Sequence, residues 1–278
     1  MKKVIGYLGP EGTYSHEVAL HIGRGCKLVA LESSKFAEAI RTKKIQQAVL
    51  PVVNAIGWQV QWVLDILLNG NGECQITQEI IWDIKSHLIG FGKVDEVIRV
   101  YSHSQPLEQC KIFLSQMKRV TTQSIDSTSA AVAFVASKKS HSFAAIGTES
   151  AAKLYGVPII AREISDHSEN QTKFIVLGGR KTPPTGHDTT SFIIGTSNEP
   201  GALLRALEVF DALGINMSEL FSMPSPNRKL GECFFYVSVD GHRGDNDLSV
   251  AIEKIRIRVE YLKVLGSYPR AITALNTL

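Results

Sequence analysis

The sequence predicts an α/β protein with two βα lobes followed by a small α+β module, and three observations lead to this fold class. Strand-like and helix-like segments alternate through the first part of the chain, which is typical of doubly wound parallel sheets. A long extended run at residues 78–91 interrupts this alternation and could carry the chain from one lobe to the other. After a linker rich in Pro and Gly at residues 178–188, the remaining elements follow the ferredoxin-like order β-α-β-β-α-β.

The composition is that of an ordinary soluble globular protein. Of the 278 residues, 44% are hydrophobic and 21% are charged, and the net charge of +3 is too small and too dispersed to indicate nucleic-acid binding. The apolar runs are shorter than a membrane span and the first residues read as a strand, so we expect a cytoplasmic protein with no membrane partner. The 8 histidines show no metal-ligand spacing and the 4 cysteines form no CxxC pair, so we expect no metal, no cofactor and reduced thiols.

The first lobe is predicted from apolar strand segments that alternate with helical segments. The strands are expected at residues 3–8, 27–31 and 48–54, and the helices at residues 16–21, 34–40 and 55–68. The segment at residues 48–54 is almost wholly apolar, which is typical of a buried parallel strand.

A glycine-containing turn follows the first strand. Its sequence is Gly9-Pro10-Glu11-Gly12-Thr13-Tyr14-Ser15, in which the two glycines allow a tight turn and Thr13 or Ser15 can cap the next helix. A helix N-terminus beside a strand end is a natural anion site, so the turn could hold a carboxylate or a phosphate. The GxGxxG dinucleotide fingerprint is absent, and a plain strand-to-helix turn is the alternative.

The second lobe is predicted from a further series of strands and helices. The strands are expected at residues 98–105, near 119–121 and at 143–147, and the helices at residues 107–117, 130–136 and 148–156. Hydroxyl side chains recur where strands lead into helices, as at Ser102, Thr128 and Thr148, which suggests a cleft for an anionic ligand between the lobes. Helix capping is the alternative reading of each of these hydroxyls.

The stretch Asn170-Gln171-Thr172-Lys173-Phe174 places an amide, a hydroxyl and a cation at the start of a buried strand-like run. Apolar runs lie on either side of it, at residues 157–160 and 174–177. Strand ends of α/β proteins are where small-molecule sites lie, so this stretch is the principal candidate site. A solvated strand edge is the alternative.

The C-terminal part is predicted to be a compact module. Its strands are expected at residues 189–195, 215–221, 232–239 and 262–267, and its helices at residues 201–213 and 248–259. That order is the ferredoxin-like arrangement.

Several separated motifs in one consistent order make the chain resemble the prephenate dehydratase family, whose members carry a C-terminal ACT regulatory domain. The motifs are Gly9–Ser15, Val100–Gln105, Ala144–Gly156, Asn170–Phe174, Pro200–Leu203 and Gly214–Asn216. The resemblance implies a two-lobed, periplasmic-binding-protein-like catalytic domain at residues 1–180, with lobes at about 1–75 plus 165–180 and at 76–164. It also implies an ACT domain at residues 188–270.

By this resemblance the protein is a lyase that removes water and carbon dioxide from prephenate, giving phenylpyruvate for L-phenylalanine biosynthesis. Thr172 is implied to act on the leaving hydroxyl, Lys173 to clamp a carboxylate where the family usually has arginine, and Asn54 to be a retained polar group of the catalytic set. The reaction makes the ring aromatic, so the enzyme needs preorganised donors more than covalent chemistry. The implied substrate contacts are Gly12, Thr13, Ser15, Ser102, Gln105, Asn170 and Phe174.

The resemblance also implies regulation and assembly. L-Phenylalanine is the implied effector, and its implied contacts are Gly201, Ala202, Leu203 and Asn216. ACT domains often pair edge to edge, which implies a homodimer or homotetramer.

The chain departs from the family at places that bear on function. The family's Pro-Ile-Glu-Asn-Ser appears as Pro51-Val52-Val53-Asn54-Ala55, and its Glu-Ser-Arg-Pro appears as Phe221-Ser222-Met223-Pro224, which weakens the expectation of phenylalanine feedback. Lysine is also a poorer bidentate partner of a carboxylate than arginine. Three hypotheses therefore stay open: a working prephenate dehydratase, a relative that decarboxylates prephenate without aromatisation or acts on another carboxylate, and a non-catalytic binding or regulatory protein.

Overall fold

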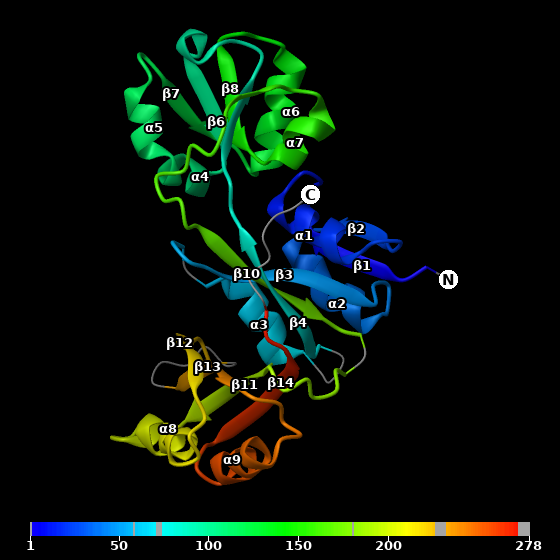
Figure 1. The fold of residues 1–278 in the computed structure, drawn as a ribbon, viewed down its shortest axis with the longest axis vertical. Helices are drawn as coiled ribbons and strands as arrows, with labels where there is room; N and C mark the ends of the chain where they lie inside the picture. Colours follow the sequence, from blue (N-terminus) through cyan, green and yellow to red (C-terminus); the bar gives the residue numbers. More distant parts are fainter. Residues whose placement is uncertain (1, 58, 71–73, 180, 226–231, 272–278) are drawn as a thin grey trace.

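The structure, a computed structural model, describes residues 2–57, 59–70, 74–179, 181–225 and 232–271. Three sheets with their helices follow one another along the longest axis of the molecule (Figure 1). The N-lobe lies in the middle and consists of residues 4–83 and 171–177. The second lobe, residues 87–161, lies at one end, and the C-terminal module, residues 188–269, lies at the other.

The N-lobe is built on a mixed sheet. Its strands are β1 (Val4–Leu8), β2 (Lys27–Leu31), β3 (Gln47–Asn54), β4 (Ile76–Asp83) and β10 (Gln171–Leu177), in the order β2-β1-β3-β10-β4. Its helices are α1 (Tyr14–Ile22), α2 (Phe36–Arg41), α3 (Gln61–Asn69) and the 3-10 turn η1 (Ser33–Lys35). The first three strands are parallel, whereas β10 is antiparallel to both β3 and β4. The sheet is therefore not parallel throughout as predicted, because β10 returns from the second lobe and enters from the opposite direction.

The side chains of β10 alternate between two buried cores. Phe174 and Val176 belong to the core beneath α1, whereas Ile175 and Leu177 belong to the core formed with α2 and α3. Successive side chains of a strand point to opposite faces of the sheet. The first residues of β10 must therefore also point to opposite faces.

The second lobe has a mixed sheet as well. Its strands are β5 (His87–Gly90), β6 (Arg99–Ser102), β7 (Thr121–Ser124), β8 (Phe143–Gly147) and β9 (Ile159–Ala161), in the order β7-β6-β8-β5-β9. Its helices are α4 (Ser104–Gln109), α5 (Lys111–Gln116), α6 (Thr128–Lys138), α7 (Glu149–Tyr155) and the 3-10 turn η2 (Val94–Glu96). The predicted extended run at residues 78–91 is divided between β4 and β5, which belong to different sheets. The chain crosses between the lobes within this run and returns through residues 162–170. The second lobe begins after β4 and not at the predicted residue 76, because β4 pairs with β10 in the N-lobe sheet.

The single helix predicted at residues 107–117 is in fact two short helices, α4 and α5, that meet at Cys110. The carboxylate of Asp166 explains the break, because its oxygens accept hydrogen bonds from the Ile112 backbone N–H at 3.0 and 3.1 Å. An acidic side chain at the first turn of a helix satisfies amides that lack intrahelical partners. Asp166 lies on the returning segment, so this break depends on tertiary contact.

The C-terminal module has the predicted ferredoxin-like topology. Its elements are β11 (Asp188–Thr196), α8 (Ala202–Ala212), β12 (Met217–Met223), β13 (Cys233–Asp240), α9 (Asn246–Arg256) and β14 (Tyr261–Pro269). Its antiparallel sheet has the order β12-β13-β11-β14, and both helices pack on one face. Arg180, at which the catalytic domain is predicted to end, lies outside the described residues.

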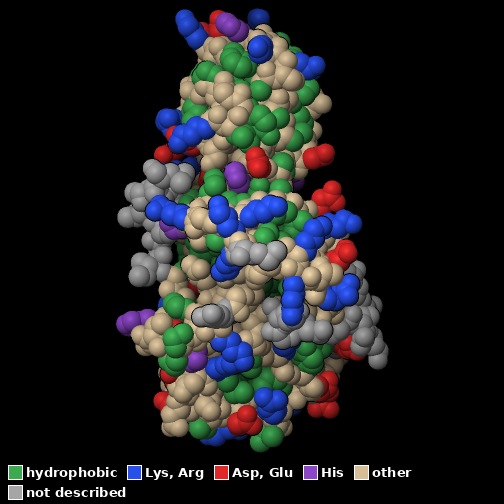
Figure 2. All heavy atoms as spheres, turned by 90° about the vertical axis from the view of Figure 1, so that its right-hand side faces the viewer, with side chains coloured by type: hydrophobic (Ala, Val, Ile, Leu, Met, Phe, Trp, Pro, Cys, Tyr) green, Lys and Arg blue, Asp and Glu red, His purple; other side chains and the backbone are tan. Residues whose placement is uncertain are grey.

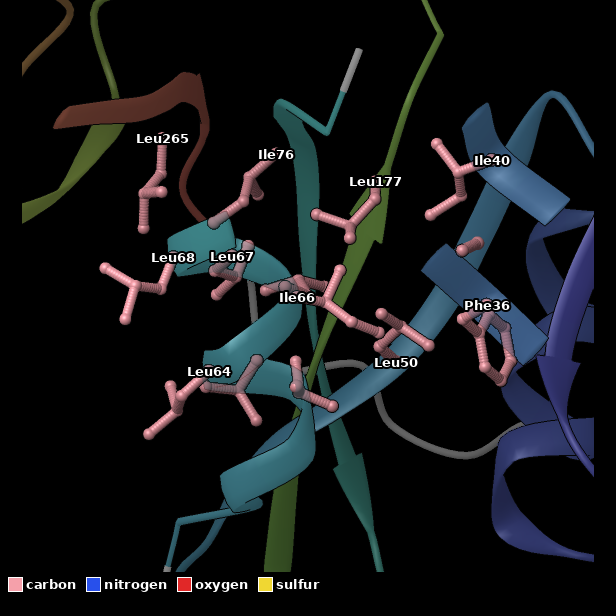
Figure 3. Packing of buried hydrophobic residues seen from close by; sticks show 14 of the residues in the cluster. Phe36, Ile40, Leu50, Leu64, Ile66, Leu67, Leu68, Ile76, Leu177 and Leu265 are labelled. Atoms are coloured by element: carbon pink, nitrogen blue, oxygen red, sulfur yellow. The ribbon is translucent and has the colours of Figure 1, made fainter. Parts of the chain in front are cut away.

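The other face of the module packs against the N-lobe. Ile193, Tyr236 and Leu265 of the module belong to the same buried cluster as Leu68 and Ile76 of the N-lobe. Figure 3 shows the side chains of this cluster arriving from the end of α3, from β4 and from β14. The two parts therefore share one hydrophobic core, and they are not two bodies joined only by a linker.

Several polar groups at this junction have hydrogen-bond partners. Lys263 Nζ of β14 donates to the carbonyl of Leu67 at 2.6 Å, near the C-terminal end of α3, where carbonyls lack intrahelical donors. Ser191 Oγ lies 2.9 Å from Tyr236 Oη and 2.6 Å from Tyr268 Oη. Hydrogen bonding of buried polar groups avoids the desolvation cost of an unpaired donor or acceptor.

The surface carries mixed charge. On the face shown in Figure 2, Lys and Arg side chains gather over the middle of the molecule, and acidic side chains lie around them. Within the part of the chain that the structure describes, no helix is long and apolar enough to cross a membrane. In the same residues, no group of three or more His, Cys, Asp and Glu side chains could hold a metal ion.

Candidate functional site

The candidate site lies at the edge of the N-lobe sheet that faces the second lobe. The C-terminal ends of β1 and β3 and the N-terminal end of β10 meet at this edge, and Thr172 is paired in register with Asn54. The two connections between the lobes also run here, since Ile84 N–H donates to the Asn170 carbonyl at 2.7 Å. The turn Gly9–Ser15 follows β1 and therefore lies at the same edge as Thr172.

Asn54 is the centre of a buried hydrogen-bond cluster. Its Oδ1 accepts hydrogen bonds from the backbone N–H groups of Ile56 at 3.1 Å and Gly57 at 2.7 Å. Its Nδ2 donates to Asn170 Oδ1 at 2.8 Å and to Thr172 Oγ1 at 2.9 Å. Backbone N–H groups can only donate, so they determine which end of the Asn54 amide carries oxygen.

This orientation decides what the Thr172 hydroxyl can do. A hydroxyl has one proton and two acceptor lone pairs, and Thr172 Oγ1 accepts the proton offered by Asn54 Nδ2. The hydroxyl proton of Thr172 therefore remains available to donate to a ligand. Asn54, Asn170 and Thr172 are 9%, 1% and 8% exposed, so the cluster is shielded from bulk water. Hydrogen bonds in such a shielded interior are electrostatically stronger than in water.

The second lobe contributes two glutamines from α4. Asn170 Nδ2 donates to Gln109 Oε1 at 3.2 Å, and a Cβ added at Gly57 would lie only 2.9 Å from Gln105 Nε2. Gln105 is one of the predicted substrate contacts, whereas Gln109 is not among the predicted residues. The two glutamines are four residues apart on a helix and so lie on one face, which is the signal that could have found Gln109.

The Gly9–Ser15 turn makes interlobe contacts. Thr148 Oγ1 of the second lobe donates to the Gly12 carbonyl at 2.6 Å, and Ser129 Oγ donates to the Glu11 carbonyl. Gly12 has φ of +81°, and a Cβ there would lie 2.8 Å from Ser129 Oγ, so glycine permits this close approach. The Gly12 N–H donates to His16 Nδ1 at 3.1 Å, and burial lowers the pKa of His16, which keeps this nitrogen an acceptor.

The side chain of Thr13 contacts its own turn and the start of α1, and Ser15 lies within α1. Thr13 Oγ1 caps α1 by accepting from His16 N–H at 3.4 Å, and it lies 3.0 Å from the Pro10 carbonyl, so the capping alternative describes Thr13. Ser15 is 6% exposed within the first turn of α1.

Lys173 is not placed as predicted. Its ammonium lies 2.7 Å from Glu79 Oε2 of β4 and 2.9 Å from Glu219 Oε2 of β12, on the face of β10 turned toward the C-terminal module. The strand alternation sends Thr172 to one face and Lys173 to the other. The expected role of Lys173 as clamp of a substrate carboxylate is therefore corrected: the structure gives it an ion pair between the N-lobe and the module.

Burial alone would lower the pKa of the Lys173 ammonium, but Tyr236, Glu219 and Glu79 together raise it above its ordinary value. Burial also raises the pKa of Tyr236, which keeps that phenol neutral. The two carboxylates therefore supply the attraction at neutral pH.

Two further predicted contacts are structural. Ser102 is fully buried, and its Oγ donates to the Ile146 carbonyl at 2.8 Å, which joins β6 to β8 inside the second lobe. Phe174 is 2% exposed and packs in the core beneath α1. Both expectations fail for the same reason: the residues lie in strands whose side chains alternate, and these side chains point into the interior.

Glu17 is a buried acid that is not among the predicted site residues. It is 7% exposed, and its carboxylate accepts hydrogen bonds from Trp82 Nε1 at 3.3 Å and from the Ser150 N–H of α7 at 3.4 Å. Burial raises the pKa of Glu17, and the hydrogen bonds from Ser150 and Trp82 oppose this rise. Because Trp82 is paired in register with Thr172, Glu17 connects the neighbourhood of the site to the second lobe.

The predicted effector residues line two neighbouring hollows of the C-terminal module. Gly201, Ala202 and Leu203 line a hollow of about 300 Å³, and Asn216 lines one of about 500 Å³. Leu204 lines both hollows and is 61% exposed. The four residues therefore lie around one exposed apolar side chain, although they do not line one common pocket.

Comparison with known proteins relates these features to a family. The sequence pattern described as "Prephenate dehydratase" matches residues 5–182, which cover the N-lobe and the second lobe. A bifunctional chorismate mutase/prephenate dehydratase from Aquifex aeolicus is 35% identical over 276 residues, covering 98% of this chain and 75% of that protein. The protein of the same description from Stutzerimonas stutzeri is 35% identical and covers 96% of this chain and 73% of that protein.

The fold is also that of a solved structure. Prephenate dehydratase from Arthrobacter aurescens in complex with L-Phe matches with a TM-score of 0.87 and 24% identity, covering 98% of this chain and 93% of that one. The match extends over the C-terminal module, which the family pattern does not include.

Proposed function

Because this chain belongs to the prephenate dehydratase family, we propose that it is a lyase that converts prephenate to phenylpyruvate in L-phenylalanine biosynthesis. The observation that carries this proposal is the Thr172 hydroxyl, which accepts a hydrogen bond from Asn54 and keeps its own proton for a ligand. It lies at an interlobe edge, where two-lobed proteins bind small molecules.

The chemistry suits such a donor. Prephenate carries a ring hydroxyl and a carboxylate on the carbon across the ring. The C–O bond breaks and the oxygen leaves as water after taking a proton, while the C–C bond to the carboxylate breaks, its electron pair enters the ring and carbon dioxide departs. Charge develops on the leaving oxygen, and a hydrogen bond from Thr172 would stabilise it. A preorganised donor of this kind is worth roughly 3 kcal/mol of barrier.

The family's glutamate position is occupied here by Val53, the cross-strand partner of Lys173. The neighbouring Asn54 is retained and donates to the Thr172 hydroxyl. This retained pair favours a working dehydratase over a decarboxylase without aromatisation and over a non-catalytic protein.

Incubation of the purified protein with prephenate, followed by product identification by NMR, tests the proposal. We expect phenylpyruvate and carbon dioxide in equal amounts. A non-aromatic keto acid as product would support the decarboxylating alternative, and binding of prephenate without turnover would support a non-catalytic role.

We further propose that the C-terminal module is an ACT-type regulatory domain that binds L-phenylalanine and pairs with a second copy. The support is the pair of hollows around Leu204, together with the L-Phe complex of the Arthrobacter aurescens relative. The family's charged positions are Phe221 and Met223 here, and both pack inward: the Phe221 ring stacks on Tyr236 with centroids 4.7 Å apart, and Met223 is 6% exposed. Neither residue lines the two hollows.

Thermal unfolding in increasing L-phenylalanine tests this second proposal. Ligand at about 100 times Kd should add about 2.7 kcal/mol to the free energy of unfolding, because it binds the folded protein alone. The Leu204→Asp variant, which places a charge between the hollows, should lose this stabilisation. Sedimentation analysis of both proteins reports the assembly, and a monomeric wild type that L-phenylalanine does not stabilise would contradict the proposal.

A further inference from the structure

Two short connections, residues 84–86 and 162–170, join the second lobe to the N-lobe and together form the hinge (Figure 1). A change in the angle between two lobes is absorbed by a few residues of such connections. The two connections also touch each other, since Ile164 N–H donates to the Ser86 carbonyl at 2.9 Å. Contacts between the connections therefore bear on how the lobes stand to each other.

Glu163, on the returning connection, has an unusual backbone conformation. Its φ is +50°, in the left-handed region that residues other than glycine occupy at a cost. Such a conformation persists where surrounding contacts hold it. Here the Glu163 N–H donates to His87 Nδ1 at 3.1 Å, and its carboxylate lies 3.1 Å from Lys85 Nζ. The ion pair is exposed and contributes little, so the imidazole is the principal contact that holds this point of the hinge.

The His87 ring can accept this hydrogen bond only while Nδ1 carries no proton. A neutral imidazole has one acceptor nitrogen, whereas in the protonated ring both nitrogens are donors. Protonation would therefore place an N–H of the ring against the N–H of Glu163. His87 is 4% exposed, so bulk water cannot readily replace the lost partner. Glu163 would then be free to leave the left-handed conformation.

The charges around His87 are mixed in sign. Its neighbours β8 and β9 contain no titratable side chain, so the charges come from the two connections and from α7. Burial is the largest influence and lowers the pKa of His87. Arg162 and Lys85 lower this pKa as well, whereas Glu149 and Glu163 raise it. The ring is therefore neutral at neutral pH, as its hydrogen bond requires.

We propose that His87 is a brace of the interlobe hinge that protonation releases: the neutral ring holds Glu163 and keeps the lobes closed, and acid lets them open. Prephenate would bind between closed lobes, so its affinity should fall as the brace is released. This readout with substrate rests on the proposed dehydratase function, whereas the position of the lobes can be measured without substrate.

The sign of the pH dependence follows from the buried ring. The closed form binds the proton more weakly than an open form in which the ring meets water. Closure is therefore full above the ordinary pKa of histidine, and it weakens as the pH falls toward the lower pKa of the closed form. A single linked proton changes the closure equilibrium by at most about tenfold per pH unit.

Three variants test the brace through kcat/KM for phenylpyruvate formation between about pH 8 and pH 5, with the uncatalysed rate subtracted. His87→Asn offers an amide oxygen near the place of Nδ1 and does not titrate, so it should match the wild type at the upper end and exceed it in acid. His87→Leu removes the acceptor and should raise KM at every pH while kcat changes little. His141→Asn, where the side chain is 70% exposed, is the matched control and should keep the wild-type profile.

The outcomes separate the brace from the proposed function. If the wild type forms phenylpyruvate and His87→Asn loses kcat/KM in acid in parallel with it, the brace is wrong while the dehydratase activity stands. If the wild type does not turn over prephenate, the proposed function fails, and the brace is judged by NMR and by solution scattering without substrate.

These two measurements need only the wild type and His87→Asn. In ¹⁵N spectra of the wild type at neutral pH, the proton of the His87 ring should lie on Nε2. The ring signals and the Glu163 amide signal should then titrate together, at a midpoint below the ordinary histidine value, and the radius of gyration should grow over the same pH range. His87→Asn should keep a constant radius. A proton on Nδ1 at neutral pH, or a wild-type radius that does not change with pH, would overturn the proposal.

Discussion

At the scale of single residues, the hydrogen-bonding capacity of one amide determines the proposed chemistry. Asn54 and Thr172 are 118 positions apart in sequence but are bonded at 2.9 Å. Because two backbone N–H groups hold the Asn54 oxygen, the amino group faces Thr172 Oγ1 and the Gln171 carbonyl. It cannot accept a hydrogen bond from Thr172, so the threonine proton is left for a ligand. A carboxylate at position 54 would reverse this direction.

The first prediction concerns the Thr172 hydroxyl. Thr172→Val keeps the shape of the side chain but removes the donor, and it should lower kcat for phenylpyruvate formation by about 10²–10³-fold. Prephenate binding, measured by calorimetry, should persist. Thr122→Val on the exposed strand β7 is the control and should leave kcat unchanged. A Thr172→Val enzyme with wild-type kcat would remove this hydroxyl from the mechanism.

The second prediction concerns the pH dependence contributed by Glu17. Burial raises its pKa in the folded protein above that of the unfolded chain, so its contribution to stability is full below the unfolded pKa and is lost as pH rises through the folded pKa. The free energy of unfolding of the wild type relative to Glu17→Gln should therefore be greatest in acid and should fall toward neutral pH.

Urea unfolding of both proteins, at intervals between about pH 4 and pH 8, measures this difference. Glu108→Gln is the control, since that side chain is 74% exposed and pairs only with a neighbouring lysine among its described contacts. The difference in unfolding free energy between the wild type and Glu108→Gln should change little over this pH range. A wild-type advantage that grows toward neutral pH would show that Glu17 is stabilised as a carboxylate.

At the scale of elements, β10 serves two parts of the molecule at once. One face carries Thr172 toward the second lobe and the core beneath α1, and the other carries Lys173 toward the C-terminal module. The strand therefore connects the proposed donor to the module by a single peptide unit. A displacement of Glu219 on β12 would act on the residue next to Thr172.

The third prediction concerns this ion pair. Lys173→Met leaves two carboxylates at 5% and 22% side-chain exposure without their cation, and breaking a buried pair costs about 3–5 kcal/mol of unfolding free energy. Affinity for prephenate should change little, because the ammonium does not face the site. Lys153→Met removes a partner of an exposed pair and should cost less than about 1 kcal/mol. A large loss of prephenate affinity in Lys173→Met would restore Lys173 as a substrate clamp.

At the scale of the whole molecule, we expect the N-lobe and the C-terminal module to unfold as one unit. They share a buried cluster, and Lys263 of the module caps the end of α3 in the N-lobe. The second lobe has cores of its own and joins the N-lobe through residues 84–86 and 162–170. We therefore expect motion between the lobes to be easier than motion between the N-lobe and the module.

The fourth prediction follows from this shared core. Leu265 of the module is 1% exposed, and Leu265→Ala should cost about 2–5 kcal/mol through lost burial and a cavity. Hydrogen exchange should show protection falling together in β10 and β13, which belong to different sheets, and less in β6 and β8. Leu154→Ala, where the side chain is 45% exposed, is the control. Loss of protection confined to the module would contradict the single unit.

Much of the fold follows from local patterns. The strands predicted at residues 27–31 and 143–147 have these bounds in the structure, and the ferredoxin-like order of the last elements is confirmed. Apolar runs, glycines and capping hydroxyls act over a few residues, so the chain itself determines where most strands and helices lie. The motifs likewise determined the family, which the comparisons show.

The tertiary structure alone decided the direction of β10 and the neighbours of its side chains. No local sequence pattern predicts that Lys173 pairs with acids from β4 and β12 or that Asp166 divides a predicted helix. The hydrogen bond between Gln109 and Asn170 is likewise not visible in the sequence. These contacts join residues far apart in sequence, and the alternation along a strand assigns a face only once the neighbouring strands are known. Sequence patterns identify an element, and packing determines what each of its faces touches.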